Sequence, residues 1–201
     1  MRIAALVGSA LLLAGATGSL AAQEHRWGIS TDFGITRFWG AARDVSTSDG
    51  AVSHPYRPTT FALRLDRSFG RVVAAFGVQY AQSGLAVEAS DLSVVGKGAF
   101  KWVQLAPEAA YRLTMLGGNS LYVFGGPVLD IWNPGNGEGR TRAGGRAGLE
   151  LRVPFGRSIA GLVRAAGAVT GSVFEDGELP AGFESTTMSR AGVSLGFRVG
   201  L

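Results

Sequence analysis

The feature that most constrains the fold is an alternation of apolar and polar residues that recurs along the chain. It is clearest from Ala191 to Leu201, where every odd-numbered residue is apolar and the even-numbered ones are Gly, Ser or Arg. The segment Trp27–Thr36, with the sequence WGISTDFGIT, has the same period of two. Successive side chains point to opposite faces only in an extended strand, so the pattern predicts β-strands with one apolar face.

Eight segments show this alternation, and the connections between them are alternately short and long. The segments are 27–36, 59–66, 74–81, 103–113, 121–129, 142–153, 159–169 and 189–201. Tight connections fall near 66–71, 114–119 and 153–158, and long polar ones cover about 40–57, 83–98, 132–140 and 171–186. Short turns at one end and long loops at the other are typical of an up-and-down barrel.

The alternation alone fits two kinds of barrel. A soluble lipocalin-like carrier buries its apolar face, whereas an outer-membrane barrel turns that face to lipid. The polar face is rich in small residues, and the mature chain has only two lysines, Lys97 and Lys101. Basic residues in the apolar set, such as Arg37 and Arg67, lie near strand ends, where they can reach lipid headgroups. We therefore predict an all-β, eight-stranded antiparallel transmembrane barrel, with the soluble carrier as an alternative.

The polar face then lines a narrow interior. Small residues there leave room for long arginine side chains, which reach carboxylates across the lumen through bidentate hydrogen bonds. We predict a structural charge network in the lumen formed by Asp32, Arg64, Glu108, Arg146, Glu150, Arg164, Arg190 and Arg198. An eight-stranded barrel is just wide enough to be filled by side chains, which argues against an open channel.

Residues 1–22 have the pattern of a secretory signal peptide. Arg2 gives a basic start, an apolar run follows, and small residues at 19–22 suit a cleavage site. We assign residues 23–201 to the barrel domain. No later apolar run approaches the length of a membrane-spanning helix, and there is no cysteine. The formal net charge of +4 is small and dispersed, so we expect no nucleic-acid partner.

Prolines at two positions conflict with the strand pattern. Pro107 and Pro127 fall inside predicted neighbouring strands, and a closed barrel has no free edge for a residue without an N–H group. If the hairpin turns at Gly117, the two prolines stand opposite each other. A bulge at this point or a shorter strand would resolve the conflict.

Candidate catalytic and metal-binding residues are few. Ser53 and His54 lie in the first long loop near Asp44 and Asp49, which is a weak match to a hydrolase constellation. The segment 133–139, NPGNGEG, has one carboxylate and lacks the ending of a phosphate-binding loop. We expect no catalytic residue, no cofactor and no metal site.

Taken together, these features resemble the small outer-membrane β-barrels of the OmpA transmembrane domain and OmpX type. The resemblance implies a monomer in the outer membrane of a Gram-negative cell envelope. Its implied partners are outer-membrane lipid, lipopolysaccharide and the barrel assembly machinery. It also implies a structural or surface-interaction role, in which the loops meet an extracellular partner. The alternatives are a small-solute channel and a lipid-modifying enzyme. The chain departs from the family in ending on Leu201 rather than on an aromatic residue.

Overall fold

The computed structural model describes residues 27–46, 51–56, 58–88, 93–134, 139–175, 177, 179 and 181–201, except for the side chains of 88, 93–99 and 134. This part of the chain forms eleven strands of one antiparallel sheet. The predicted signal peptide, 1–22, lies outside the described residues, so its boundary with the barrel domain stays a prediction. The predicted loop 133–139 is described only at its ends.

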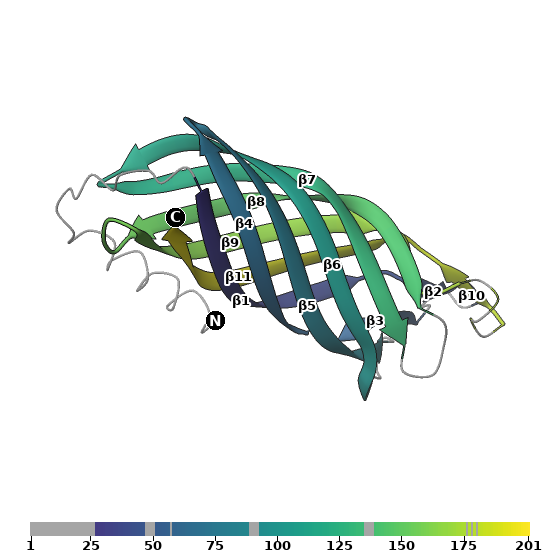
Figure 1. The fold of residues 1–201 in the computed structure, drawn as a ribbon. Coiled ribbons are helices and arrows are strands. Elements are labelled where there is room, and N and C mark those ends of the chain that lie inside the picture. The colour runs from purple at the N-terminus through teal and green to yellow at the C-terminus, as the bar shows by residue number, and fades with distance from the viewer. Residues whose placement is uncertain are drawn as a thin grey trace.

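Eight of the strands close into a barrel, which confirms the predicted architecture (Figure 1). They are β1 (Trp27–Trp39), β4 (Thr59–Phe69), β5 (Val72–Glu88), β6 (Ser93–Leu116), β7 (Asn119–Pro134), β8 (Arg140–Pro154), β9 (Ile159–Thr170) and β11 (Met188–Gly200). Each pairs with its neighbours in the chain, and β1 pairs with β11 to complete the ring. Each of the eight predicted segments overlaps one of these strands.

One end of the barrel, the short-turn end, carries the tight connections expected from the sequence. Gly117 and Gly118 join β6 to β7 with φ angles of +57° and +88°. Positive φ at both central residues is the type I′ geometry, whose twist matches that of the paired strands. Leu201 lies at this end too, next to the start of β1, where its amide donates a hydrogen bond to the Trp27 carbonyl at 3.0 Å.

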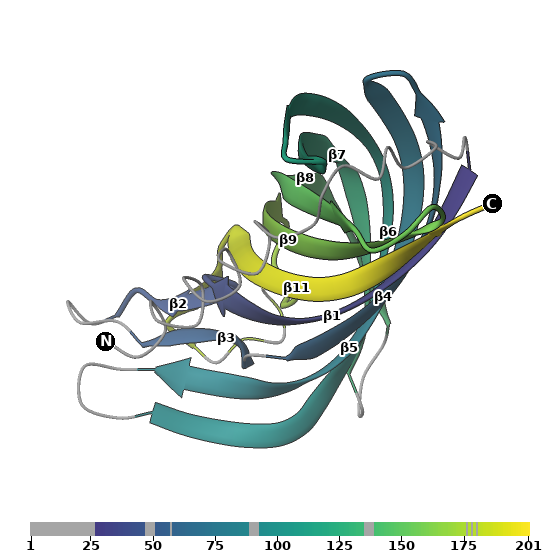
Figure 2. The same cartoon turned by 90° about the vertical axis from the view of Figure 1, so that its left-hand side faces the viewer.

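The opposite end, the long-loop end, is more ordered than the sequence suggests. The predicted loop 40–57 contains β2 (Ala42–Asp44) and β3 (Val52–Tyr56), and the loop 171–186 contains β10 (Phe183–Ser185). These strands continue the sheet beyond the barrel in the order β10-β2-β3-β5 (Figure 2). The prediction of a loop at 83–98 is wrong, because β5 and β6 pair through most of this segment. We call this projecting sheet the extension.

The two prolines do stand opposite each other, but without a bulge or a shortened strand. Leu105 pairs with Leu129 and Ala109 with Gly125, so the register is the same on both sides of the prolines. Pairing lapses across 106–108 and 126–128, and the irregular step in β6 lies further on, between Arg112 and Thr114. Because the two prolines face each other, both absent N–H groups fall at the same position of the strand pair. The rest of the hairpin therefore keeps its ladder of hydrogen bonds.

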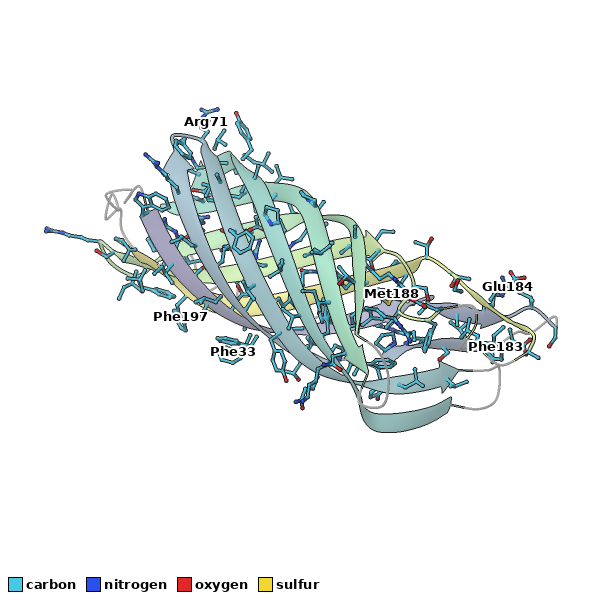
Figure 3. All side chains as sticks on the ribbon, turned by 45° about the vertical axis from the view of Figure 1, so that its right-hand side comes forward. Phe33, Arg71, Phe183, Glu184, Met188 and Phe197 are labelled. Carbon is cyan, nitrogen blue, oxygen red and sulfur yellow. The ribbon has the colours of Figure 1, made fainter. Side chains whose placement is uncertain are left out.

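The alternation is realised as one exposed apolar face and one enclosed polar face. Phe33 and Leu195 are a cross-strand pair, and their side chains are 62% and 64% exposed on the outer surface of the barrel. Asp32, next to Phe33 in the chain, is only 5% exposed. Phe33 and Phe197 project outward from the wall in Figure 3. We call the band of outward apolar side chains on the eight barrel strands the apolar belt.

Arginines beside aromatic rings lie near the two ends of strand β1. The Arg67 guanidinium lies 5.1 Å from the ring centroid of Trp27 at the short-turn end. The Arg37 guanidinium lies 5.5 Å from the ring of Trp39 at the long-loop end. Arginine over an aromatic face is a cation–π contact that suits a surface partly apolar and partly polar.

Some of the inward glycines lie so close to neighbouring atoms that a larger residue would force these atoms to shift. A Cβ atom on Gly148 would come within 2.6 Å of the Phe124 ring and 2.9 Å of the Ala166 Cα atom. A Cβ on Gly145, three residues earlier in the same strand, would have no atom within 4 Å.

We therefore expect Gly148→Ala to lower the free energy of unfolding by about 1–3 kcal/mol through overpacking. Gly145→Ala is the matched control and should leave the stability nearly unchanged. Urea unfolding in detergent micelles measures both variants, and equal midpoints would contradict the close approach at Gly148.

Candidate functional site: the barrel lumen

The centre of the lumen is occupied by two carboxylates that share a set of arginines. Glu108 on β6 accepts hydrogen bonds from Arg164 Nη2 at 2.8 and 3.0 Å. It also contacts Arg64 Nη1 and Arg146 Nη2, each at 3.3 Å. All four side chains are at least nine-tenths buried, so these contacts lie in a medium of low polarity, where ion pairs are strong.

The second carboxylate, Glu150 on β8, contacts an overlapping set. Its Oε2 atom lies 2.9 Å from both Arg64 Nη2 and Arg164 Nε. Its Oε1 atom accepts a hydrogen bond from Arg152 Nε at 2.5 Å. Arg64 and Arg164 therefore bridge the two glutamates, and the cluster joins strands β4, β6, β8 and β9. We call these six residues the central cluster.

A second ion pair lies toward the long-loop end. Both terminal nitrogens of Arg190 on β11 donate to Asp130 on β7, and Gln104 Nε2 donates to the same carboxylate at 2.8 Å. Arg146 donates to Gln104 Oε1 at 3.0 Å, which connects this pair to the central cluster. The third pair, Arg198 with Asp66, lies at the short-turn end beside Gly28 of β1, and Arg198 Nη2 lies 2.7 Å from Asp66 Oδ1.

Seven of the eight predicted lumen residues make these ion pairs; the exception is Asp32. It lies inside the lumen, but no ion pair among the described residues includes it, and its Oδ2 atom has no hydrogen-bond partner. Its cross-strand neighbours are Ala62 and Gly196, neither of which offers a side-chain donor. Asp32 therefore lies in the lumen, where it was predicted, but it makes none of the ion pairs of the network.

Sequence reasoning missed Asp66, Asp130 and Arg152 as members of the network. Asp66 continues the polar set of β4 after Arg64, so the alternation alone would have included it. Asp130 is harder to find, because the inward face of β7 also carries Tyr122 and Phe124 and reads as apolar. Its role depends on a partner sixty residues away, which the local pattern does not contain.

Aromatic rings fill the space between the charged groups. The Arg164 and Arg146 guanidinium groups lie 4.1 and 5.3 Å from the ring centroid of Phe124. Arg152 lies 4.3 Å from the ring of Tyr122. Such cation–π contacts stabilise guanidinium groups that burial has removed from water.

Toward the long-loop end the lumen is closed by a buried apolar cluster. We call it the aromatic plug; its residues are Phe38, Phe100, Trp102, Trp132, Val173 and Met188, each at most 7% exposed. Trp102 and Trp132 stack with ring centroids 5.4 Å apart and planes 12° apart. Phe38 meets both rings edge-on, at 5.6 and 5.7 Å. The Arg190 guanidinium lies 4.8 Å from the ring centroid of Trp102, so the aromatic plug is in contact with the charge network.

A cavity of about 60 Å³ remains between the aromatic plug and the central cluster. Trp102 and Arg190 line it on the side of the plug, and Arg64 and Glu108 line it on the side of the cluster. Small residues such as Ser194 form much of its wall, and Asp32 faces it as well. We call this cavity the chamber.

The residues weighed for catalysis are not brought together by the contacts that the structure describes. Ser53 and His54 are consecutive on β3, so their side chains point to opposite faces. Asp44 Oδ1 accepts hydrogen bonds from the Ser46 amide and hydroxyl at 2.8 and 2.6 Å. Asp49 lies outside the described residues. Within the described ranges, no three acidic or histidine side chains are grouped to hold a metal ion, and no helix is long and apolar enough to span a membrane.

Comparisons with known proteins agree on the fold. No protein-family model matches the chain, and neither does any curated protein. Among solved structures, Neisserial surface protein A (NspA) is similar with a TM-score of 0.55 at 11% identity, over 87% of this chain and 97% of that one. Outer membrane protein AlkL in lipid bilayers gives 0.53 at 12% identity, over 91% and 93%. OprG from Pseudomonas aeruginosa gives 0.52 at 11% identity, over 90% and 98%. The chain thus has the fold of a small outer-membrane β-barrel.

Proposed function

We propose that the chain is an integral outer-membrane barrel that acts through its long-loop end, as a structural or surface-interaction protein. The observation that carries the proposal is the apolar belt. Three of its residues, Phe33, Leu63 and Leu195, are 49–64% exposed. Soluble proteins rarely expose a contiguous apolar patch of more than a few hundred Å², whereas a barrel in lipid requires such a band.

The contents of the lumen support a role other than open passage. Its middle is crossed by the central cluster, and the aromatic plug fills it toward the long-loop end. The Arg198–Asp66 pair adds a further charged contact near the short-turn end. Buried guanidinium and carboxylate groups held in several contacts each do not leave the lumen readily, since separating them leaves an unpaired charge. This arrangement favours the structural role over the small-solute channel.

The extension supports a role in surface contacts. In outer-membrane barrels the long loops face the outside of the cell. Here described parts of these segments form the extension, with exposed side chains such as Val45, Tyr56 and Glu184. Binding residues are disproportionately found on loops that a rigid scaffold holds in place. The barrel would thus serve as the scaffold, and lipid, lipopolysaccharide and the assembly machinery would be its partners in the envelope.

Cell fractionation and gel mobility test the proposal. We expect the mature protein to partition with the outer membrane and to migrate differently in boiled and unboiled gel samples, because the closed barrel resists detergent until it is heated. Purified barrels in planar lipid bilayers should conduct little. Recovery in the soluble periplasmic fraction would favour the lipocalin-like carrier, and steady conductance would favour the channel. Loss of acyl chains from lipid A, abolished by His54→Ala, would favour the enzyme.

A further inference from the structure

The segment 171–175, between β9 and β10, has exposed ends but directs its middle residue, Val173, inward at the long-loop end. Val173 is fully buried in the aromatic plug, against rings that come from the barrel strands. Phe174 packs beside it, with its ring centroid 6.2 Å from that of Phe100. A loop residue therefore supplies part of the seal of the lumen.

Specific hydrogen bonds hold this segment down. The guanidinium groups of Arg140 and Arg142 donate to the carbonyls of Val173 and Ser172, at 2.6 and 2.5 Å. The Ser172 hydroxyl donates to the Ala41 carbonyl at 2.5 Å and accepts from the Phe174 amide at 3.0 Å. None of these bonds belongs to the barrel ladder, so the segment can lift while the barrel stays closed as a sheet.

The chamber beneath the plug is built for water. Around it, Asp32 Oδ2 is a buried acceptor without a partner, and the Nε atoms of Arg64 and Arg146 are buried donors without a partner. Only a molecule that both donates and accepts satisfies all three, and water does so. One water needs roughly 10–15 Å³ of cavity volume, so the chamber, at about 60 Å³, holds several.

We propose that residues 171–175 form a latched lid over a hydrated chamber, and that release of the latch opens the chamber to small solutes. The ion pairs near the short-turn end, Arg198–Asp66 and Arg152–Glu150, join side chains of barrel strands alone, whereas the aromatic plug also takes Val173 from a loop. The lid goes beyond the proposed surface role, and it does not depend on where in the cell the barrel resides.

Cysteine accessibility tests the lid, since the chain has no cysteine of its own. Val173→Cys reports on lifting of the lid, and Ser194→Cys reports on entry into the chamber. Each is combined with the latch variant Ser172→Ala/Arg142→Ala and treated with 2-aminoethyl methanethiosulfonate in detergent micelles. The matched control variant carries Arg157→Ala on the exposed short turn instead.

We expect both cysteines to react at least tenfold faster in the latch variant than in the parent or the Arg157→Ala control. Heat-shifted gel mobility should be unchanged, which shows that the barrel itself is intact. Fast reaction of Ser194→Cys in the parent would mean that the chamber is already open. Faster reaction at Val173→Cys alone would mean that the segment is a surface flap with no control over the chamber. Either result overturns the proposal.

Discussion

Replacing Glu150 with alanine should lower the free energy of unfolding by about 3–5 kcal/mol, the usual cost of removing one partner from a buried ion pair. The change removes the acceptor that Arg64, Arg152 and Arg164 share, and it leaves Glu108 as the one carboxylate among the four guanidinium groups of the central cluster. Urea unfolding in detergent micelles, followed by circular dichroism, measures the loss.

The control for this variant is Glu184→Ala, which removes the same side chain from an exposed site on β10. Its stability should stay within about 0.5 kcal/mol of the parent, as for most surface substitutions. Glu150→Gln keeps the volume of the side chain and should lose nearly as much as Glu150→Ala, because the loss comes from the missing charge. Parental stability of Glu150→Ala would mean that the central cluster contributes nothing to folding.

Placing arginine at Leu195, near the middle of β11 and of the apolar belt, should cost about 2–4 kcal/mol of folding stability in lipid vesicles. A guanidinium group at that depth has neither water nor a carboxylate within reach. The matched control is Val45→Arg on the extension, because Val45 is apolar and 54% exposed, close to the 64% of Leu195.

The folded fraction in vesicles of outer-membrane-like composition, measured by gel mobility, compares the two variants. We expect Val45→Arg to fold like the parent. If both arginines were tolerated equally, the belt would not face lipid, and the barrel would be a soluble one.

The barrel itself could be predicted from the sequence because its signal is local. From Ala191 to Gly200 in β11, apolar residues alternate with Gly, Ser or Arg, so the sequence indicates which face of the strand each side chain occupies. The tight turns are indicated by pairs such as Gly117–Gly118. The extension could not be predicted in the same way. Strands β2 and β10 have three residues each, too few to show a period, and their partners lie far apart in the chain.

The lumen was predictable in composition but not in its pairings. That Arg190 and Arg198 point inward follows from their parity in β11, yet their partners, Asp130 and Asp66, depend on how the barrel closes. For Asp32, the sequence predicts the position of the side chain but not its surroundings. Its parity is right, but the two neighbouring strands place Ala62 and Gly196 beside it, and its Oδ2 atom is buried without a donor.

The division of the four tryptophans gives the protein two independent optical signals. Trp27 and Trp39 lie on the outer surface near the ends of β1, so their fluorescence should shift when the barrel passes from water into lipid. Trp102 and Trp132 are fixed against each other in an asymmetric buried setting, which produces near-ultraviolet circular dichroism only after side chains have packed. A refolding experiment can therefore time membrane insertion and completion of the interior separately, in one unlabelled chain.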